Sequence, residues 1–380
     1  MNAKTKALAA AAVAAVLLAT AFAMMLPHDS RDGEEIEGYW YQLAYSGYRD
    51  GEYTANGDGN NPSTFDISIS ACHDGVFCGT YLGTDLSGTY SHGIMEFYGT
   101  YGGIKTFHYA TFADGIMYAA VIEQKADGTV NVFMNIYCQE AGRTVYDIPE
   151  TAELAPVWQA YKAEFMSDGG EITSLIGTRV LIEKQEGHIF GGTMEQMVDG
   201  KIVGLSMYGV LTACVEDGLT LGYVVVAGEM WAVITDGSTV FRLRTGMIDT
   251  SGVDGTLVTV NRSYSTDGEA VGETFPDLEG TSWAGSGLTV AAGGEIAGSV
   301  SEYEITVAVQ CNALFYAELT VGGAEYHVLG YIYGDNFEFS FARGETYVYG
   351  AGHLLADGSL YFNEWSPDGS AACGTMSAVR

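Results

Sequence analysis

The residues of this chain that could do chemistry are its histidines, its cysteines and a few glycine-rich loops. The segment EGHIFGGTM at 186–194 places His188 shortly before a glycine pair, a pattern that could bind a phosphate or a metal. A phosphate-binding loop needs a lysine after the glycines and then a helix, whereas the residues MEQ occupy that place here. The segment therefore favours a hairpin turn between two strands, and a ligand or catalytic role for His188 is the lesser alternative.

Other reactive residue types show no catalytic or metal-binding spacing. The seven histidines form no H-x-H or H-E-x-x-H pair, and neither C-x-x-C nor G-x-S-x-G occurs. The loop NGDGNNPSTFDI at 56–67 has oxygen-bearing side chains at alternating positions, as a calcium loop has. It carries Asn61 where such a loop needs glycine and Ile67 where it needs glutamate. We predict no catalytic residue, no metal site and no cofactor, and we expect a protein that is not an enzyme.

The cysteine count bears on disulfide bonds, because exported proteins often carry them. A bridge between Cys311 and Cys373 is the most attractive pairing. In a simple closed meander one strand would separate these two positions by roughly 9 to 10 Å, which is beyond bonding reach, so the pairing stays open. The six cysteines are Cys72, Cys78, Cys138, Cys214, Cys311 and Cys373.

The N-terminus has the pattern of an export signal. Lys4 and Lys6 precede an uncharged run over 7–26, and an A-x-A cleavage pattern lies at 21–23. The run is also long enough to span a bilayer if it is not cut. Residues 1–26 are therefore predicted to be a cleaved signal peptide or a membrane anchor, and the protein is expected to be extracellular or at the cell surface. We expect membrane contact only through this segment.

The overall composition is acidic and typical of a β protein. The formal net charge is −32, from 16 basic and 48 acidic residues. Nucleic acid is an improbable partner because phosphate binding needs clustered basic residues. An acidic surface favours solubility, and attraction of Ca²⁺ or of a basic partner is the sharper alternative. The chain also has 51 glycines, 25 tyrosines and only 6 prolines, which favours an all-β fold with tight turns.

One sequence unit occurs three times. A tryptophan is followed about ten residues later by a glycine turn, and a shared phenylalanine lies 37, 32 and 32 residues after the tryptophan in the three copies. We predict repeats at 36–148, 149–264 and 278–380, with an acidic linker at 265–277. The marker residues of the three repeats are Trp40 and Phe77, Trp158 and Phe190, and Trp283 and Phe315.

Each repeat is predicted to be a small antiparallel β-barrel. Turn signals every 8 to 14 residues divide each unit into six to eight strands, and closing such a meander removes its exposed edges. The segment 152–166 conflicts with this, since Trp158, Tyr161 and Phe165 recur at helical spacing. The repeat predicts a strand there, and we follow the repeat.

These residues resemble the small barrels of the lipocalin and avidin superfamily. The resemblance rests on Gly38-Tyr39-Trp40 at a strand start, on a following F-x-G or F-C-G hairpin, and on an arginine near the end of each unit. It implies that each marker tryptophan packs inside one end of its barrel under a late arginine, a cation–π contact. The matching arginines would be Arg143, Arg262 and Arg380.

Two classes of function fit three small barrels. The first is a surface protein that binds a small apolar ligand or a glycan without catalysis. The second is a structural or adhesion component of the cell envelope whose barrels are filled by their own side chains. Because YVVVAGEMWAV at 223–233 is apolar on both faces, we expect a plugged middle barrel that packs on a neighbour. Any ligand is then expected on exposed aromatic residues of the first or third barrel, with Tyr326, Tyr331 and Tyr333 as candidate contacts.

Overall fold

The structure is a computed structural model, and it describes most of the chain after residue 35. The described ranges are 36–56, 66–91, 93–140, 151–174, 177–216, 218–227, 229–244, 258–291, 296, 299–344 and 346–379. The predicted signal or anchor at 1–26 and most of the loop at 56–67 lie outside these ranges. Within them, no helix is long and apolar enough to cross a membrane.

The described chain is built from 26 β-strands and contains no α-helix, so the all-β prediction is confirmed. The first group of strands is β1 (Gly38–Arg49), β2 (Glu52–Asn56), β3 (Ile67–His73), β4 (Val76–Tyr81), β5 (Thr84–Ser91), β6 (Ile94–Tyr101), β7 (Ile104–Ala113), β8 (Ile116–Gln124) and β9 (Val130–Cys138). The second is β10 (Val157–Ser167), β11 (Ile172–Ser174), β12 (Arg179–Glu186), β13 (Ile189–Val198), β14 (Lys201–Glu216), β15 (Leu219–Val226), β16 (Glu229–Thr235), β17 (Phe241–Arg244) and β18 (Val258–Ser265). The third is β19 (Ser282–Val290), β20 (Ser299–Cys311), β21 (Leu314–Val321), β22 (Ala324–Tyr333), β23 (Asn336–Arg343), β24 (Thr346–Leu354), β25 (Leu360–Trp365) and β26 (Ala371–Ala378).

Each group of strands closes into an antiparallel barrel with eight wall positions. In the first barrel β9 pairs with β1, while β2 and β3 pair with different ends of β1 and together form one wall position. The second barrel repeats this with β11 and β12 on β10 and with β18 closing on β10. The third barrel closes directly from β19 to β26. The segment with helical spacing is strand β10, because pairing with three other strands outweighs its local helix preference.

The three tryptophans occupy the same place in the three barrels. Each is the second or third residue of the first strand, each is buried, and each pairs with an apolar residue of the neighbouring strand. The pairs are Trp40 with Ile67, Trp158 with Val180, and Trp283 with Ile305.

A phenylalanine ring lies over a glycine of the next strand in every barrel. The pairs are Phe77 over Gly88, Phe190 over Gly209 and Phe315 over Gly330. In all three pairs, a Cβ added to the glycine would lie 2.4 Å from the phenylalanine Cζ atom. Only glycine leaves room for the ring, which explains why the same hairpin recurs in each sequence unit.

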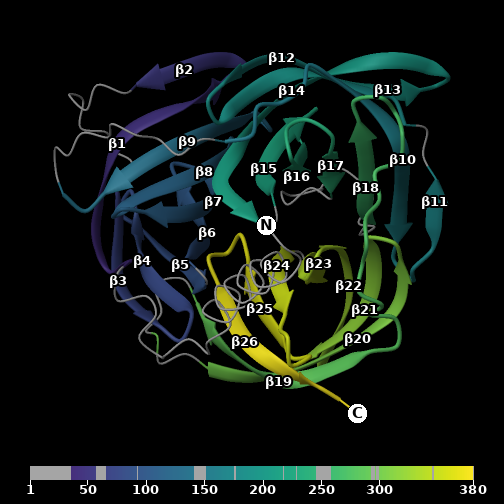
Figure 1. The fold of residues 1–380 in the computed structure, drawn as a ribbon. Coiled ribbons are helices and arrows are strands. Elements are labelled where there is room, and N and C mark those ends of the chain that lie inside the picture. Colours follow the sequence, from purple (N-terminus) through teal and green to yellow (C-terminus); the bar gives the residue numbers. More distant parts are fainter. Residues whose placement is uncertain are drawn as a thin grey trace, which may run out of the picture.

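The three barrels lie next to one another (Figure 1). Side chains on their outer walls form one shared apolar core. Tyr223 of the second barrel packs against Tyr109 of the first barrel at a ring distance of 5.8 Å. Trp365 of the third barrel stacks on Phe107 of the first barrel, also at 5.8 Å. Strands β15 and β16 of the middle barrel are apolar on both faces, one filling the barrel and one joining the shared core. The expectation that the middle barrel packs on a neighbour is confirmed.

We expect Gly209→Ala to lower the free energy of unfolding by about 1 to 3 kcal/mol, because the new Cβ forces the Phe190 ring out of its place. Gly272→Ala is the matched control, since no atom lies within 4 Å of the position of its Cβ. Urea unfolding followed by circular dichroism measures both changes. Equal stability of the two variants would contradict the packing described.

Candidate functional site

The tyrosines predicted to contact a ligand do not lie together. Alternation along β22 places Tyr326 with the interior cluster of the third barrel. Tyr331 and Tyr333 instead point outward into the shared core, where Tyr331 is only 2% exposed. The small face of β22 points inward, but the rings of Phe315, Phe337 and other aromatic residues fill the barrel. The three tyrosines therefore cannot contact the same ligand.

Cys311 and Cys373 are free thiols. Cys311 lies on β20 and Cys373 on β26, the two strands that flank β19 on opposite sides. The Cys311–Cys373 bridge, which the sequence left open, is therefore not formed. Cys373 instead donates a hydrogen bond from Sγ to the backbone oxygen of Asp74 at 2.9 Å, across the contact between the third and first barrels. The side chain of Cys214 lies outside the described residues.

His188 lies in the hairpin between β12 and β13, as the turn interpretation predicts. It is buried, and its Nδ1 atom is 2.9 Å from the backbone oxygen of Leu211. The backbone oxygen of His188 accepts a hydrogen bond from the amide of Leu211 at 2.8 Å. These contacts fasten the hairpin to β14 and give the histidine a structural role.

A charged residue inside the middle barrel was not among the predicted ligand contacts. Strand β18 alternates, so that Val260 and Tyr264 face the interior cluster while Asn261 and Ser263 face out. Arg262 shares the inward face, between Ala163 of β10 and Leu243 of β17, and it is 7% exposed. The barrel thus encloses a guanidinium group within an apolar interior.

The surroundings of Arg262 contain no carboxylate partner within the described residues. Its guanidinium carbon lies 5.5 Å from the centre of the Trp231 ring, and its Nη1 atom contacts the sulfur of Met194 at 3.9 Å. Several buried polar atoms of this interior also lack a hydrogen-bond partner in the described part of the chain. They are Arg262 Nε, Trp231 Nε1 and Trp158 Nε1. The Tyr264 hydroxyl instead interacts with the Arg262 guanidinium, which lowers the pKa of this tyrosine against the effect of burial.

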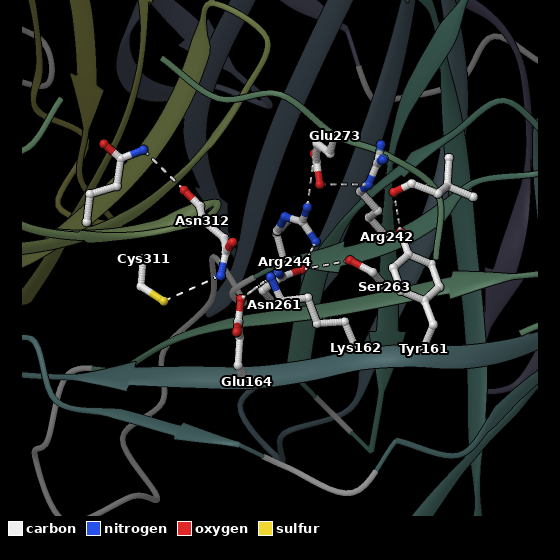
Figure 2. A network of polar contacts seen from close by, with 12 residues as sticks. Tyr161, Lys162, Glu164, Arg242, Arg244, Asn261, Ser263, Glu273, Cys311 and Asn312 are labelled. Carbon is white, nitrogen blue, oxygen red and sulfur yellow. Dashed lines mark hydrogen bonds and ion pairs between the residues drawn. The ribbon is translucent and has the colours of Figure 1, made fainter. Parts of the chain in front are cut away.

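The outward side chains of the same strand are, in contrast, well paired (Figure 2). Asn261 accepts a hydrogen bond from Arg244 and donates one to Glu164 at 3.1 Å. Glu273 of the linker forms ion pairs with both Arg242 and Arg244, at 3.2 and 3.5 Å. Burial lowers the pKa of Arg244 to about 10, against the opposing charge of Glu273. This network seals the contact between the second and third barrels.

Arg262 is therefore the buried arginine, among those described, that lacks an acidic partner. A guanidinium stays charged at any pH that a folded protein survives. Burying an ion without a counter-charge costs several kcal/mol, so buried charges in proteins are normally paired. The arrangement can bind an anionic group, with Trp231 supplying a flat face and the thioether of Met194 an adaptable apolar wall.

The resemblance to lipocalins implies that a late arginine lies over each marker tryptophan. In the middle barrel the structure shows a different arrangement. Arg262 lies over Trp231 of β16 and not over Trp158. Trp158 instead packs on Phe241 at a ring distance of 5.3 Å. Arg143 and Arg380 lie outside the described residues. A cation over an indole recurs as expected, but its partner is a different tryptophan.

The fold and the site define a class of protein, a tandem of three eight-stranded antiparallel barrels with a buried cationic centre in the middle one. No protein-family model matches the chain, and no curated protein matches it. Among solved structures, it is similar to a DUF3598-family protein of unknown function from Nostoc punctiforme, with 12% identity, a TM-score of 0.24, and coverage of 59% of this chain and 95% of that chain. It is also similar to a double mutant of the vaccine antigen transferrin binding protein B from Haemophilus parasuis, with 10% identity, a TM-score of 0.18, and coverage of 90% and 75%. At such TM-scores these likenesses carry no argument about function.

We expect Arg262→Met to raise the free energy of unfolding of ligand-free protein by about 1 to 4 kcal/mol, because it removes an uncompensated buried charge. The matched variant Arg244→Met should lower it by about 3 kcal/mol, since Glu273 and Asn261 lose their partner. Denaturant unfolding of protein refolded from guanidinium measures both. A loss of stability in Arg262→Met as large as in Arg244→Met would show that the Arg262 charge is satisfied within the chain.

Proposed function

We propose that this protein binds a small amphipathic anion inside its middle barrel, without catalysis. The observation that carries the proposal is the buried Arg262 guanidinium, which has no carboxylate partner among the described residues. The carboxylate or other anionic head of the ligand pairs with this guanidinium, and its apolar body replaces protein contacts in the interior. This proposal keeps the class of a small, largely apolar ligand but replaces the expectation that the middle barrel is plugged and that the ligand lies on the first or third barrel.

The interior around Arg262 suits a ligand with an aromatic or flexible apolar body. Trp231 is 7% exposed and offers both a ring face and an unpartnered Nε1 donor. Met194 and Met207 lie in the same interior cluster, and unbranched thioether side chains repack around ligands at low cost. A charge-assisted pair in this apolar setting contributes more than it would on the surface.

The proposal includes export to the cell surface or the exterior. Lys4, Lys6 and the uncharged run at 7–26 support an export signal or an anchor. The net charge of −32 supports a soluble surface and speaks against a nucleic-acid partner. Such a surface repels an anionic ligand, so the proposed binding depends on the local charge of Arg262 and not on the field of the whole protein.

A structural role in the cell envelope is the second candidate, and the first and third barrels favour it. Aromatic side chains fill both interiors. In the first barrel His108 stacks on Phe97 at 4.2 Å and packs edge-on against Tyr81 at 4.7 Å. Burial lowers the pKa of His108 to about 3, so it stays neutral. Under both candidate functions, these two filled barrels support the middle barrel from outside.

We expect decanoate to bind the full chain more tightly than decanol, because only the carboxylate pairs with Arg262. Arg262→Gln should weaken decanoate binding about tenfold or more, the effect of losing one charge-assisted hydrogen bond, and should leave decanol binding nearly unchanged. Titration calorimetry measures both affinities.

Arg179→Gln is the matched control, since Arg179 is exposed and pairs with Glu195 on the barrel surface at 2.6 Å. It should bind decanoate as the unmodified protein does. If Arg262→Gln and Arg179→Gln weaken decanoate binding equally, decanoate binds the surface and not the interior of the barrel. Binding of neither probe to any variant would favour the structural role.

A further inference from the structure

Two buried carboxyl groups lie at the contact between the first and third barrels. Glu96 of β6 and Glu338 of β23 both point outward from their barrels, and they are 5% and 6% exposed. Asn363 of the third barrel donates a hydrogen bond to Glu96 Oε2, and its amide also lies 3.1 Å from the hydroxyl of Thr89. The same amide thus fastens two strands of the first barrel to the third.

In the described part of the chain, the groups around the two carboxyls include hydroxyls but no cation that pairs with either carboxyl. Glu96 lies opposite Thr89 and Tyr109 on its neighbouring strands, and Glu338 lies opposite Tyr331. The Tyr331 hydroxyl faces the Glu338 carboxyl, and hydrogen bonding between them lowers the pKa of Glu338, although burial acts more strongly in the opposite direction. The titratable groups that face the pair are Tyr109, Tyr223, Tyr331, Tyr361 and Arg244.

Arg244 does not neutralise the pair. Its guanidinium carbon lies 5.8 Å from the Tyr331 ring, and its hydrogen bonds go to Asn261 and Glu273. Burial is the main reason that the pKa of Glu96 rises to about 8, and the neighbouring Glu338 carboxylate adds to the rise against the Asn363 amide. Burial also raises the pKa of Glu338 to about 7.

We propose that Glu96 and Glu338 form a proton-operated latch that holds the first and third barrels together while both carboxyls are neutral and releases them when both ionise. Ionisation places two like charges in an apolar contact that offers them no cation. Opening admits water to both carboxylates and releases their two protons to solvent. The barrels keep their own cores, because Glu96 and Glu338 point away from them.

The direction of the pH effect follows from proton linkage. The closed contact raises both pKa values above the ordinary 4.5 of a glutamate, so the closed form binds more protons than the open form. The latch is therefore closed below about pH 4.5 and loosens as the pH rises toward 8. In this window the ratio of open to closed molecules rises at most about tenfold per pH unit for each carboxyl, and it levels off above pH 8.

Trp365 supplies a reporter for the opening. It is 1% exposed, points outward from β25, and stacks on Phe107 of the first barrel. The other tryptophans all lie in the interior clusters of the barrels and are unaffected when two barrels separate; they are Trp40, Trp158, Trp231 and Trp283.

The experiment is acrylamide quenching of tryptophan fluorescence in the full chain from pH 4.5 to 9.5, with circular dichroism to follow the barrels. Quenching should rise with pH, level off above pH 8, and be accompanied by an unchanged far-ultraviolet spectrum. The double variant Glu96→Gln and Glu338→Gln keeps the contact neutral, so its quenching should not rise with pH. Glu325→Gln, an exposed position of β22, should behave as the unmodified protein does.

A rise in the double variant equal to that of the unmodified protein would overturn the latch, as would constant quenching in the unmodified protein. If the double variant fails to fold, Glu338→Gln alone decides the matter. Loss of one titrating carboxyl should halve the slope of the logarithm of the open-to-closed ratio against pH. An unchanged slope in that variant would refute the proposal.

Discussion

The structure depends on the requirement that each barrel bury apolar surface on both sides of its wall. Inside, three separate clusters fill the barrels, and outside, one common cluster joins residues from all three. A barrel removed from its neighbours would expose large aromatic rings such as Tyr223 and Trp365 to water, at about 25 cal/mol per Å² of apolar surface. The three repeats therefore form one folded unit as long as the contacts between the barrels are closed.

This requirement also decides which polar groups are buried and therefore destabilise the protein unless they are paired. Polar residues on the outward faces are buried as soon as the barrels meet, and most of them are matched, as Arg242 and Arg244 are by Glu273. Two places are not matched in this way. Among the described residues, Arg262 has a charge without an acid inside the middle barrel, and Glu96 and Glu338 are two acids without a cation between barrels. The first exception motivates the proposed ligand and the second the proposed latch.

The sequence predicts the fold well because the same packing constraint occurs in all three barrels and leaves the same residue pattern in each repeat. The spacing of tryptophan and phenylalanine reflects one hairpin with a ring over a glycine, and this constraint holds equally in each barrel. The conflict at 152–166 is resolved in favour of the strand for the same reason, since Trp158 must pair with Val180. The mutual placement of the barrels could not be predicted, because it depends on outward faces that differ between the repeats.

The candidate site could be predicted only in part. In VTVNRSYS at 258–265, Val260 and Tyr264 share one face with Arg262, while Asn261 and Ser263 share the other. An arginine on the apolar face of a strand is a readable signal of a buried charge. Whether an acid from another strand neutralises it depends on the tertiary structure, which one sequence does not reveal. The sequence also could not show that the tyrosines of β22 divide between two clusters, with Tyr331 and Tyr333 in the shared core and Tyr326 at the interior of the third barrel.

The central claim is that Arg262 takes its counter-charge from a bound molecule. The most direct measurement is an experimental structure of the full chain purified from its host and soaked with a long-chain carboxylate. The account predicts an anionic group of a bound molecule within hydrogen-bond distance of the Arg262 guanidinium, with its apolar body beside Trp231 and Met194. An ion pair between Arg262 and a carboxylate of the chain itself would contradict it.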